Sequence, residues 1–277
     1  MSATNPPGWI LHVYSMELRK VLSYRVDFWV QFLGTLFTDI TISYFLWMAV
    51  YAGSGTTRIG GYTFAGMMTY YVLLPLVNRV VRGSDIGFFS PEIYDGSLTR
   101  YLVYPVPYFG YKYLSYLALS TVALLQLVIM TALFKFGVGP FFHLSLGETL
   151  GGSQLLLGMV AAVASSFVYF SAMGALEMLA FWNDAVWTVL VMLRFSAQFL
   201  GGGLVPLSLF PAWSRPILDW LPFQYMIAFP VRVMMGETSP AFVLNGLLAC
   251  AFWGSVFLGA ANLLWRRGSY QYSGVGI

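Results

Sequence analysis

The stretch YLSYLALSTVALLQLVIMTALF, residues 113–134, contains no charged residue and lies between Lys112 and Lys135. About 20 apolar residues in a helix span the hydrocarbon core of a bilayer, which is roughly 30 Å thick. A helix on the surface of a soluble protein would carry charged residues on the face toward water. This stretch has no such face, so it predicts a transmembrane helix.

The composition of the whole chain agrees with this segment. Of the 277 residues, 58% are hydrophobic and only 9% are charged. A soluble domain carries roughly 25% charged residues, because its surface faces water. The basic residues are scattered and the net charge is only +3, so the sequence offers no basic face for nucleic acid. We therefore predict an all-α, polytopic membrane protein that contacts membrane lipids.

Similar apolar runs lie on both sides of the first segment. Together they predict six spans, over residues 28–50, 62–81, 113–134, 154–178, 185–205 and 239–265 of a single transmembrane domain, 1–277. An even number of spans places both termini on one side of the membrane. Most basic residues that flank the spans fall on that side, so we expect both termini to be cytoplasmic.

Two segments between the spans have helical signals of their own. Residues 8–27 carry apolar side chains at helical spacing, which indicates an amphipathic helix in the cytoplasmic interface or a helix packed on the rest of the protein. In the cytoplasmic loop over residues 85–108, Ser90-Pro91 is typical of a helix start and Gly96 of a helix end. Two short capped helices at this face would form a compact platform.

The segment after the fifth predicted span is broken by proline and glycine. Gly201-Gly202-Gly203 precede a still apolar run, 206–236, that contains five widely spaced prolines, Pro206, Pro211, Pro216, Pro222 and Pro230. One straight helix cannot accommodate these residues. We expect a re-entrant hairpin in the outer leaflet, which is tolerated only where protein buries the broken backbone.

Two charges lie well inside predicted spans, away from the span ends. Asp39 falls near the middle of the first span and Arg194 lies within the fifth. An unpaired charge in the bilayer is costly, so each should face a partner or a water-filled cavity. Asp39 and Arg194 can form an intramembrane charge pair, line a substrate pathway, or do neither.

The sequence lacks the motifs of a catalytic or metal-binding protein. It contains no GxxxxGK[ST] loop for ATP phosphates, and no HExxH, CxxC or GxSxG motif. The single cysteine, Cys250, lies in an apolar run, and the two histidines fall on opposite sides of the predicted membrane. We expect no catalytic residue, no metal and no cofactor in this chain.

One cytoplasmic stretch resembles a known family. Residues 92–108, EIYDGSLTRYLVYPVPY, resemble the I-x-x-G-x-L-x-x-Y-L-x-x-P signature of ABC-2 type transporter permeases, closest to a small six-span subfamily of permease components. The residues before the first span and the proline-rich run before the sixth are similar to that family too. The resemblance covers nearly the whole chain.

The resemblance implies a transmembrane fold of the ABC-2, or type V exporter, kind. Residues 8–27 would be the elbow helix, and the loop would hold the coupling helix that seats in a separate ATP-binding subunit. The implied contact residues are Glu92, Ile93, Tyr94, Asp95, Leu98 and Arg100. Two such ATPase subunits would bind ATP and Mg beneath two permease chains, identical or paralogous, in a bacterial cytoplasmic (inner) membrane. Family members mostly export their substrates.

Three other classes remain open at this point. A secondary transporter or channel would work without an ATPase partner. A membrane-embedded acyl or glycosyl transferase would need convergent His, Asp or Glu residues at one leaflet, and the sequence shows no such cluster. A scaffold or assembly factor for another complex would need neither.

Overall fold

The computed structural model describes residues 8–23, 25–83, 87–138 and 151–272, without the side chains of 25–28 and 31. The described chain is helical and contains no strand, only an isolated bridge between Ile59 and Tyr62. The helices are α1 Trp9–Ser23, α2 Arg25–Ser54, α3 Phe64–Arg82, α4 Ser90–Tyr94, α5 Leu98–Leu102, α6 Tyr108–Leu133, α8 Gly152–Glu177, α9 Val186–Leu200, α10 Arg215–Trp220, α11 Phe223–Met226, α12 Ala228–Met234 and α13 Pro240–Gly268. A π-helical turn, η1 Phe134–Val138, and three 3-10 turns, η2 Met178–Phe181, η3 Leu207–Leu209 and η4 Ala212–Ser214, complete the elements.

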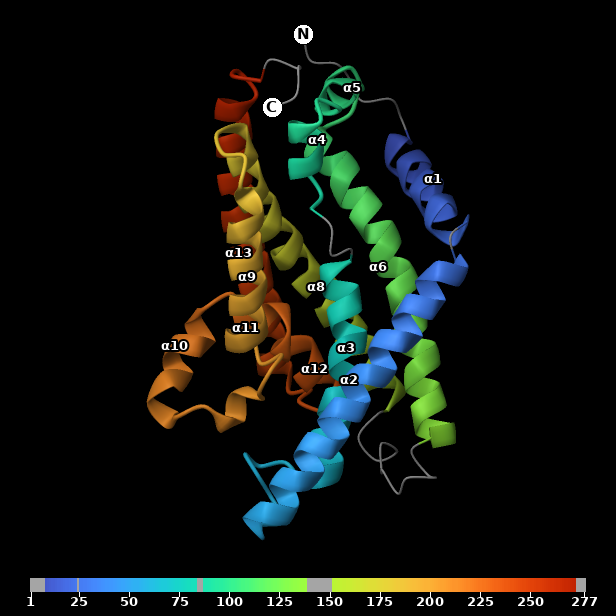
Figure 1. Ribbon diagram of the computed structural model, residues 1–277, viewed down its shortest axis with the longest axis vertical. Helices are drawn as coiled ribbons and strands as arrows, with labels where there is room; N and C mark the ends of the chain where they lie inside the picture. The colour runs from blue at the N-terminus through green and yellow to red at the C-terminus, as the bar shows by residue number, and fades with distance from the viewer. Residues whose placement is uncertain (1–7, 24, 84–86, 139–150, 273–277) are drawn as a thin grey trace.

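Five described helices are long and apolar enough to cross a membrane. They are Phe32–Ser54, Phe64–Arg82, Tyr108–Gly137, Gly152–Phe181 and Pro240–Gly268. They correspond to five of the six predicted spans and make the protein a multi-pass, all-α membrane protein. In Figure 1, α3 lies centrally between α6 on one side and α9 and α13 on the other, and α2 crosses in front of it.

The fifth predicted span is shorter than expected. The sequence predicted residues 185–205, but α9 has 15 residues and ends at Leu200. A helix of this length rises about 22 Å, less than the hydrocarbon core. The cause lies at Gly201, where a Cβ atom would come within 2.2 Å of the Ala197 carbonyl oxygen and 2.6 Å of the Phe223 carbonyl oxygen. The backbone of α11 thus approaches the end of α9 so closely that only glycine fits there.

The core is centred on α3 and α8. On α3, side chains that include Met67, Tyr70 and Val77 are almost completely buried. On α8, small residues let neighbouring helices approach, as is common between transmembrane helices. A Cβ atom on Gly158 would lie 2.1 Å from Met234 of α12, and one on Gly254 of α13 would lie 2.4 Å from Phe167 of α8. Dispersion contacts between closely packed helices therefore hold this half of the molecule together.

The broken segment between α9 and α13 is a set of short helices whose backbone is paired with the core. The Ala228 N–H donates to the Gly201 carbonyl at 3.0 Å. From α3, the Tyr70 hydroxyl donates to the Gly202 carbonyl at 2.6 Å and the Tyr71 hydroxyl to the Leu204 carbonyl at 2.7 Å. These bonds satisfy carbonyl groups that no helix pairs, which is the condition for irregular backbone at membrane depth.

The first helix, α1, lies against α6 (Figure 1). The Tyr14 hydroxyl and the Thr121 hydroxyl are 2.8 Å apart, and the Tyr111 hydroxyl donates to Glu17 at 2.9 Å. The apolar side chains of Ile10 and Leu11 remain exposed. Packing on the protein, one of the two alternatives for residues 8–27, is therefore seen for α1, and its place in a membrane interface stays a prediction.

Candidate functional site

Residues 90–104, which we call the tip, lie at one end of the molecule and comprise α4, α5 and the turn after α5 (Figure 1). Pro91 occupies the first turn of α4, where its missing N–H costs nothing. Gly96, between the two helices, has φ of 77°, a left-handed conformation that glycine adopts without a steric cost. Proline and glycine thus set the start of α4 and the reversal into α5.

A buried carboxylate from α8 holds the start of α4. Glu177 is fully buried at the end of α8. It accepts hydrogen bonds from the backbone N–H groups of Phe88, Phe89 and Ser90 at 3.1, 2.7 and 2.9 Å, and from the Ser90 hydroxyl at 3.2 Å. The first N–H groups of a helix have no partner inside the helix. Ser90 was expected to cap α4 itself, but a carboxylate distant in sequence takes that role.

A second carboxylate, Glu92, points from α4 into the protein. It accepts hydrogen bonds from the Lys112 ammonium at 2.5 Å and from the Tyr108 hydroxyl at 2.6 Å, both at the start of α6. The side chains of Glu92 and Lys112 are only 12% and 11% exposed, so this ion pair is largely removed from water. Arg100 lies farther off, 3.7 Å from Glu92. Glu92 therefore ties the tip to α6, as Glu177 ties it to α8.

One aromatic residue of the tip, Tyr101, lies beside this ion pair. The Tyr101 ring lies 5.0 Å from the Lys112 ammonium and 4.8 Å from the Arg100 guanidinium. Burial, together with the charge of Glu92, raises the pKa of Tyr101 to about 12. Tyr101 thus stays a neutral hydroxyl at physiological pH and adds no negative charge beside Glu92.

The six residues expected to contact an ATPase subunit divide into two groups. Ile93 and Leu98 are buried, and Glu92 faces Lys112. Tyr94 donates its hydroxyl to the Asn183 carbonyl at 2.8 Å. Asp95 and Arg100 are exposed on the outer surface. The inward residues attach the tip to the transmembrane helices, whereas Asp95 and Arg100 are exposed, Arg100 also lying beside Glu92 and Tyr101.

The outer surface of the tip is apolar with a charged edge. Leu102, Val103 and Tyr104 are 50%, 76% and 45% exposed. Asp95 is also exposed on the tip, and hydrogen bonds from Ser97 hold the pKa of its carboxyl below the usual range. Contiguous exposed apolar side chains with a polar rim are typical of protein interaction sites.

Asp39 and Arg194 do not form an ion pair or a hydrogen bond with each other, although the structure describes both side chains. Asp39 is exposed on α2, and the basic residue whose charge acts on it is Arg82 of α3. Arg82 in turn donates a hydrogen bond to Gln198 of α9. The polar groups of α2, α3 and α9 thus meet through Arg82.

Sequence reasoning missed Glu177, Lys112 and Arg82 as parts of the site. Glu177 and Lys112 had served only as the charged ends of apolar runs. Both lie at the predicted cytoplasmic ends of spans, so a carboxylate or ammonium there is ordinarily explained by contact with water. The one available signal for Glu177 is its position, because it directly follows an uninterrupted apolar run. Among the described residues, no group of His, Cys, Asp and Glu side chains could hold a metal ion.

Comparison with known proteins gives one match. A family model described as "ABC-2 family transporter protein" matches residues 37–276, which include α3 to α13 and most of α2. No curated protein and no solved structure matches the chain.

Proposed function

The chain belongs to the ABC-2 family of transporter proteins, and from this premise we propose that it is the permease subunit of an exporter driven by a separate ATP-binding subunit. Family membership and the five apolar helices support a membrane permease of an ABC transporter. The proposal adds the direction of transport, two permease chains, identical or paralogous, and two ATPase subunits that bind ATP and Mg. It also adds a bacterial inner membrane with both termini in the cytoplasm.

The observation that carries the proposal is the attachment of the tip. Its outer surface exposes Leu102, Val103 and Tyr104, while its inner surface is bound to two different transmembrane helices. A loop that only connects two spans does not need buried carboxylates that bind it to neighbouring helices. An element that transmits force needs a surface for the motor and rigid connections to the helices that move.

The connections suggest how motion would pass into the membrane. A displacement of α4 would pull on α8 through Glu177 and on α6 through the Glu92–Lys112 pair. ATP can drive this change only if it binds more tightly when the two ATPase subunits are closed. The tip would then follow the closing subunits, and α6 and α8 would move with it.

The exposed face of α2 supports a second permease chain. Phe37, Ile42 and Phe45 are 74%, 61% and 60% exposed, and Asp39 lies among them. A carboxylate in the middle of the bilayer costs about 2.5–3.5 kcal/mol on insertion scales. We propose that this face meets the second chain, where Asp39 and, from α9, Arg194 would border a polar substrate pathway. In this arrangement the second chain would remove Asp39 from lipid.

The test is ATP hydrolysis by the complex purified through this chain. The chain has no P-loop, so Mg-dependent ATPase activity that co-purifies with it must come from a partner. Val103→Asp places a charge in the middle of the exposed tip surface, and we expect it to lower the retained activity by at least about tenfold, as for a central interface residue. Tyr270→Asp is the matched control, because Tyr270 is 91% exposed but lies outside the tip.

Two results would contradict the proposal. One is a wild-type complex that retains no ATPase activity after purification under mild conditions. The other is a Val103→Asp chain that is folded and keeps the wild-type activity, because the tip would then not be the docking surface.

A further inference from the structure

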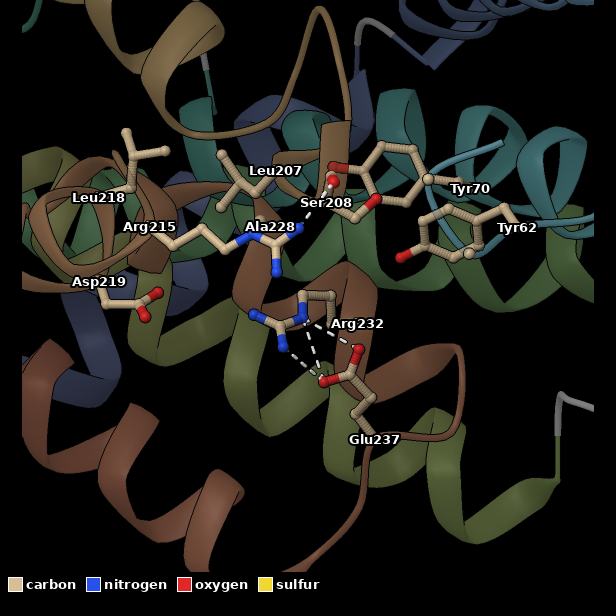
Figure 2. Close-up of a pocket in the computed structure, with 12 residues that line it drawn as sticks. Tyr62, Tyr70, Leu207, Ser208, Arg215, Leu218, Asp219, Ala228, Arg232 and Glu237 are labelled. Atoms are coloured by element: carbon tan, nitrogen blue, oxygen red, sulfur yellow. Dashed lines mark hydrogen bonds and ion pairs between the residues drawn. The ribbon is translucent and has the colours of Figure 1, made fainter. Parts of the chain in front are cut away.

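A cavity of about 600 Å³ lies between the α2–α3 connection and the short helices that precede α13. Among the elements that line it is α10, which lies away from the tip in Figure 1. Figure 2 shows the side chains that line it, and the charged ones among them are Arg215, Asp219, Arg232 and Glu237. The proposed coupling uses none of these residues, so their gathering in one cavity requires a separate explanation.

The guanidinium groups of Arg215 and Arg232 both point into the middle of this cavity (Figure 2). Like charges repel, so two guanidinium groups directed at one space are best accommodated by an anion between them. Arg215 donates only a long hydrogen bond, 3.3 Å, to the Ser208 carbonyl, and no described carboxylate lies within ion-pair distance of it. Arg215 thus has no direct ion-pair partner among the described residues, although Asp219 and Glu237 line the same cavity.

Arg232 is held in place and keeps binding capacity. Its Nε and Nη2 atoms donate to Glu237 at 2.7 to 3.1 Å, and its guanidinium lies 4.7 Å from the Phe242 ring. No described residue accepts a hydrogen bond from its Nη1 atom. Glu237 and Phe242 thus fix the orientation of Arg232, which lowers the entropy cost of binding a ligand at Nη1.

Two hydroxyl groups add to the donors in the cavity. The Ser208 Oγ atom is buried and has no hydrogen-bond partner among the described residues. The Tyr62 hydroxyl also points into the cavity in Figure 2. A buried hydroxyl without a partner costs roughly 1–3 kcal/mol. A ligand with several oxygen acceptors would supply the missing partner.

The neighbouring surface indicates where such a ligand would come from. On α10, Arg215, Leu218 and Asp219 line the cavity, whereas Ile217 and Trp220 are 55% and 69% exposed. Trp213, just before α10, is 75% exposed. Exposed tryptophans beside charged residues are typical of the headgroup level of a membrane. These residues would place the mouth of the cavity at the level of the lipid headgroups.

We propose that this cavity binds the phosphate headgroup of a membrane amphiphile, with the phosphate between Arg215 and Arg232. A phosphate has enough oxygens to accept hydrogen bonds from both guanidinium groups and from Ser208. The Asp219 carboxylate lines the same cavity and accepts a hydroxyl or ammonium group carried by the headgroup. The site goes beyond the proposed coupling and does not depend on an ATPase partner.

The test compares two lipids that differ only in the headgroup. The purified full chain in a mild detergent is mixed with equal amounts of dioleoyl phosphatidylglycerol and dioleoylglycerol, and the bound lipid is measured by native mass spectrometry. We expect the wild-type chain to retain phosphatidylglycerol preferentially. Arg215→Gln should lower its affinity about 10- to 100-fold, the effect of losing one charge-assisted hydrogen bond. Ser208→Ala should lower it several-fold.

The matched control is Arg58→Gln. Arg58 is exposed in the α2–α3 connection and does not line the cavity, so its loss removes the same charge without removing a ligand contact. If Arg58→Gln weakens binding as much as Arg215→Gln, or if Arg215→Gln binds like the wild type, the proposal is wrong. Should Arg215→Gln fail to fold, Arg215→Lys tests the proposal instead. It keeps the positive charge but lacks the planar guanidinium group, so it should weaken lipid binding several-fold.

Inorganic phosphate distinguishes two sources of the same chemistry. Displacement of phosphatidylglycerol by excess phosphate would show that the site recognises the phosphate group by itself and also binds a free anion. Retention of the lipid would show that the acyl chains or the glycerol contribute, as for a headgroup that remains in the membrane. Both outcomes support the phosphate site, and neither involves the tip, so failure here would leave the proposed coupling intact.

Discussion

Glu177→Ala is expected to detach the start of α4 from α8. The substitution removes the acceptor of three backbone N–H groups and of the Ser90 hydroxyl. Phe89 and Ser90 are buried, so water cannot easily replace the carboxylate at their N–H groups. Phe88 is partly exposed and regains a partner more readily. The loss should therefore be concentrated at the first turn of α4.

The size of the effect follows from these bonds. A buried donor left without a partner costs about 1–3 kcal/mol, which gives roughly 2–6 kcal/mol for the Phe89 and Ser90 N–H groups together. Removing a buried carboxylate also removes its desolvation cost, which offsets part of the loss. We expect the free energy that holds α4 against α8 to fall by about 3 kcal/mol. The equilibrium constant for local opening of α4 should then rise roughly 100-fold.

Amide hydrogen exchange measures this opening directly. In α4, the Ile93 and Asp95 N–H groups donate to the Phe89 and Pro91 carbonyls. Their exchange should accelerate roughly 100-fold in Glu177→Ala. Glu177→Gln keeps one acceptor oxygen and should give a smaller increase. The control is Asp184→Asn, which removes an exposed carboxylate near the same end of the molecule and should leave exchange in α4 unchanged.

The same variants test whether α4 must be held in order to transmit motion. If coupling runs through Glu177, Glu177→Ala should lower ATPase stimulation while the spans keep their thermal stability. Unchanged exchange in α4 would refute the reasoning, because the four hydrogen bonds would then contribute nothing to its position.

Three further predictions concern stability. Lys112→Met alone should lower the free energy of unfolding by about 3–5 kcal/mol, measured by thermal unfolding, because it leaves Glu92 buried without its cation. Adding Glu92→Gln should restore much of this stability. Arg100→Gln changes an exposed partner of Glu92 and should cost less than about 1 kcal/mol. Gly201→Ala should lower the free energy of unfolding by about 3 kcal/mol or more, because the new Cβ atom would collide with backbone carbonyls. The control is Gly259→Ala, whose Cβ atom would meet no atom within 4 Å, so it should be neutral or stabilising. Melting temperatures of the two variants measure the difference. Hydrogen bonds from Ser97 depress the pKa of Asp95, so ionised Asp95 stabilises the tip above its unfolded-state pKa of about 4, and this contribution is lost as the pH falls through the folded-state pKa. Asp95→Asn should therefore destabilise the tip slightly at pH 7, by about 0.5 kcal/mol or less, and the difference from wild type should shrink in acid.

The long helices could be predicted because their signal is local. Runs such as residues 113–134 are apolar along their whole length, and in a bilayer such a run must satisfy its backbone by forming a helix. The break after α9 was also predictable, because proline and consecutive glycines disfavour a helix wherever they occur. The predicted span ran a few residues past the end of α9, although Gly201-Gly202-Gly203 mark that end locally; the close approach of α11 to Gly201 was visible only in the structure.

The sequence by itself determined that this is a polytopic helical membrane protein with a short-helix element in one loop, because hydrophobicity and the conformational preferences of proline and glycine act residue by residue. Only the tertiary structure decided what the few charged residues do. Glu92 turned inward to Lys112, Glu177 became the acceptor for a helix start 87 residues away, and Arg215 and Arg232 met in one cavity. A charge in a protein of low charge content is stabilised by whichever group lies beside it, and folding, rather than spacing along the chain, selects that neighbour.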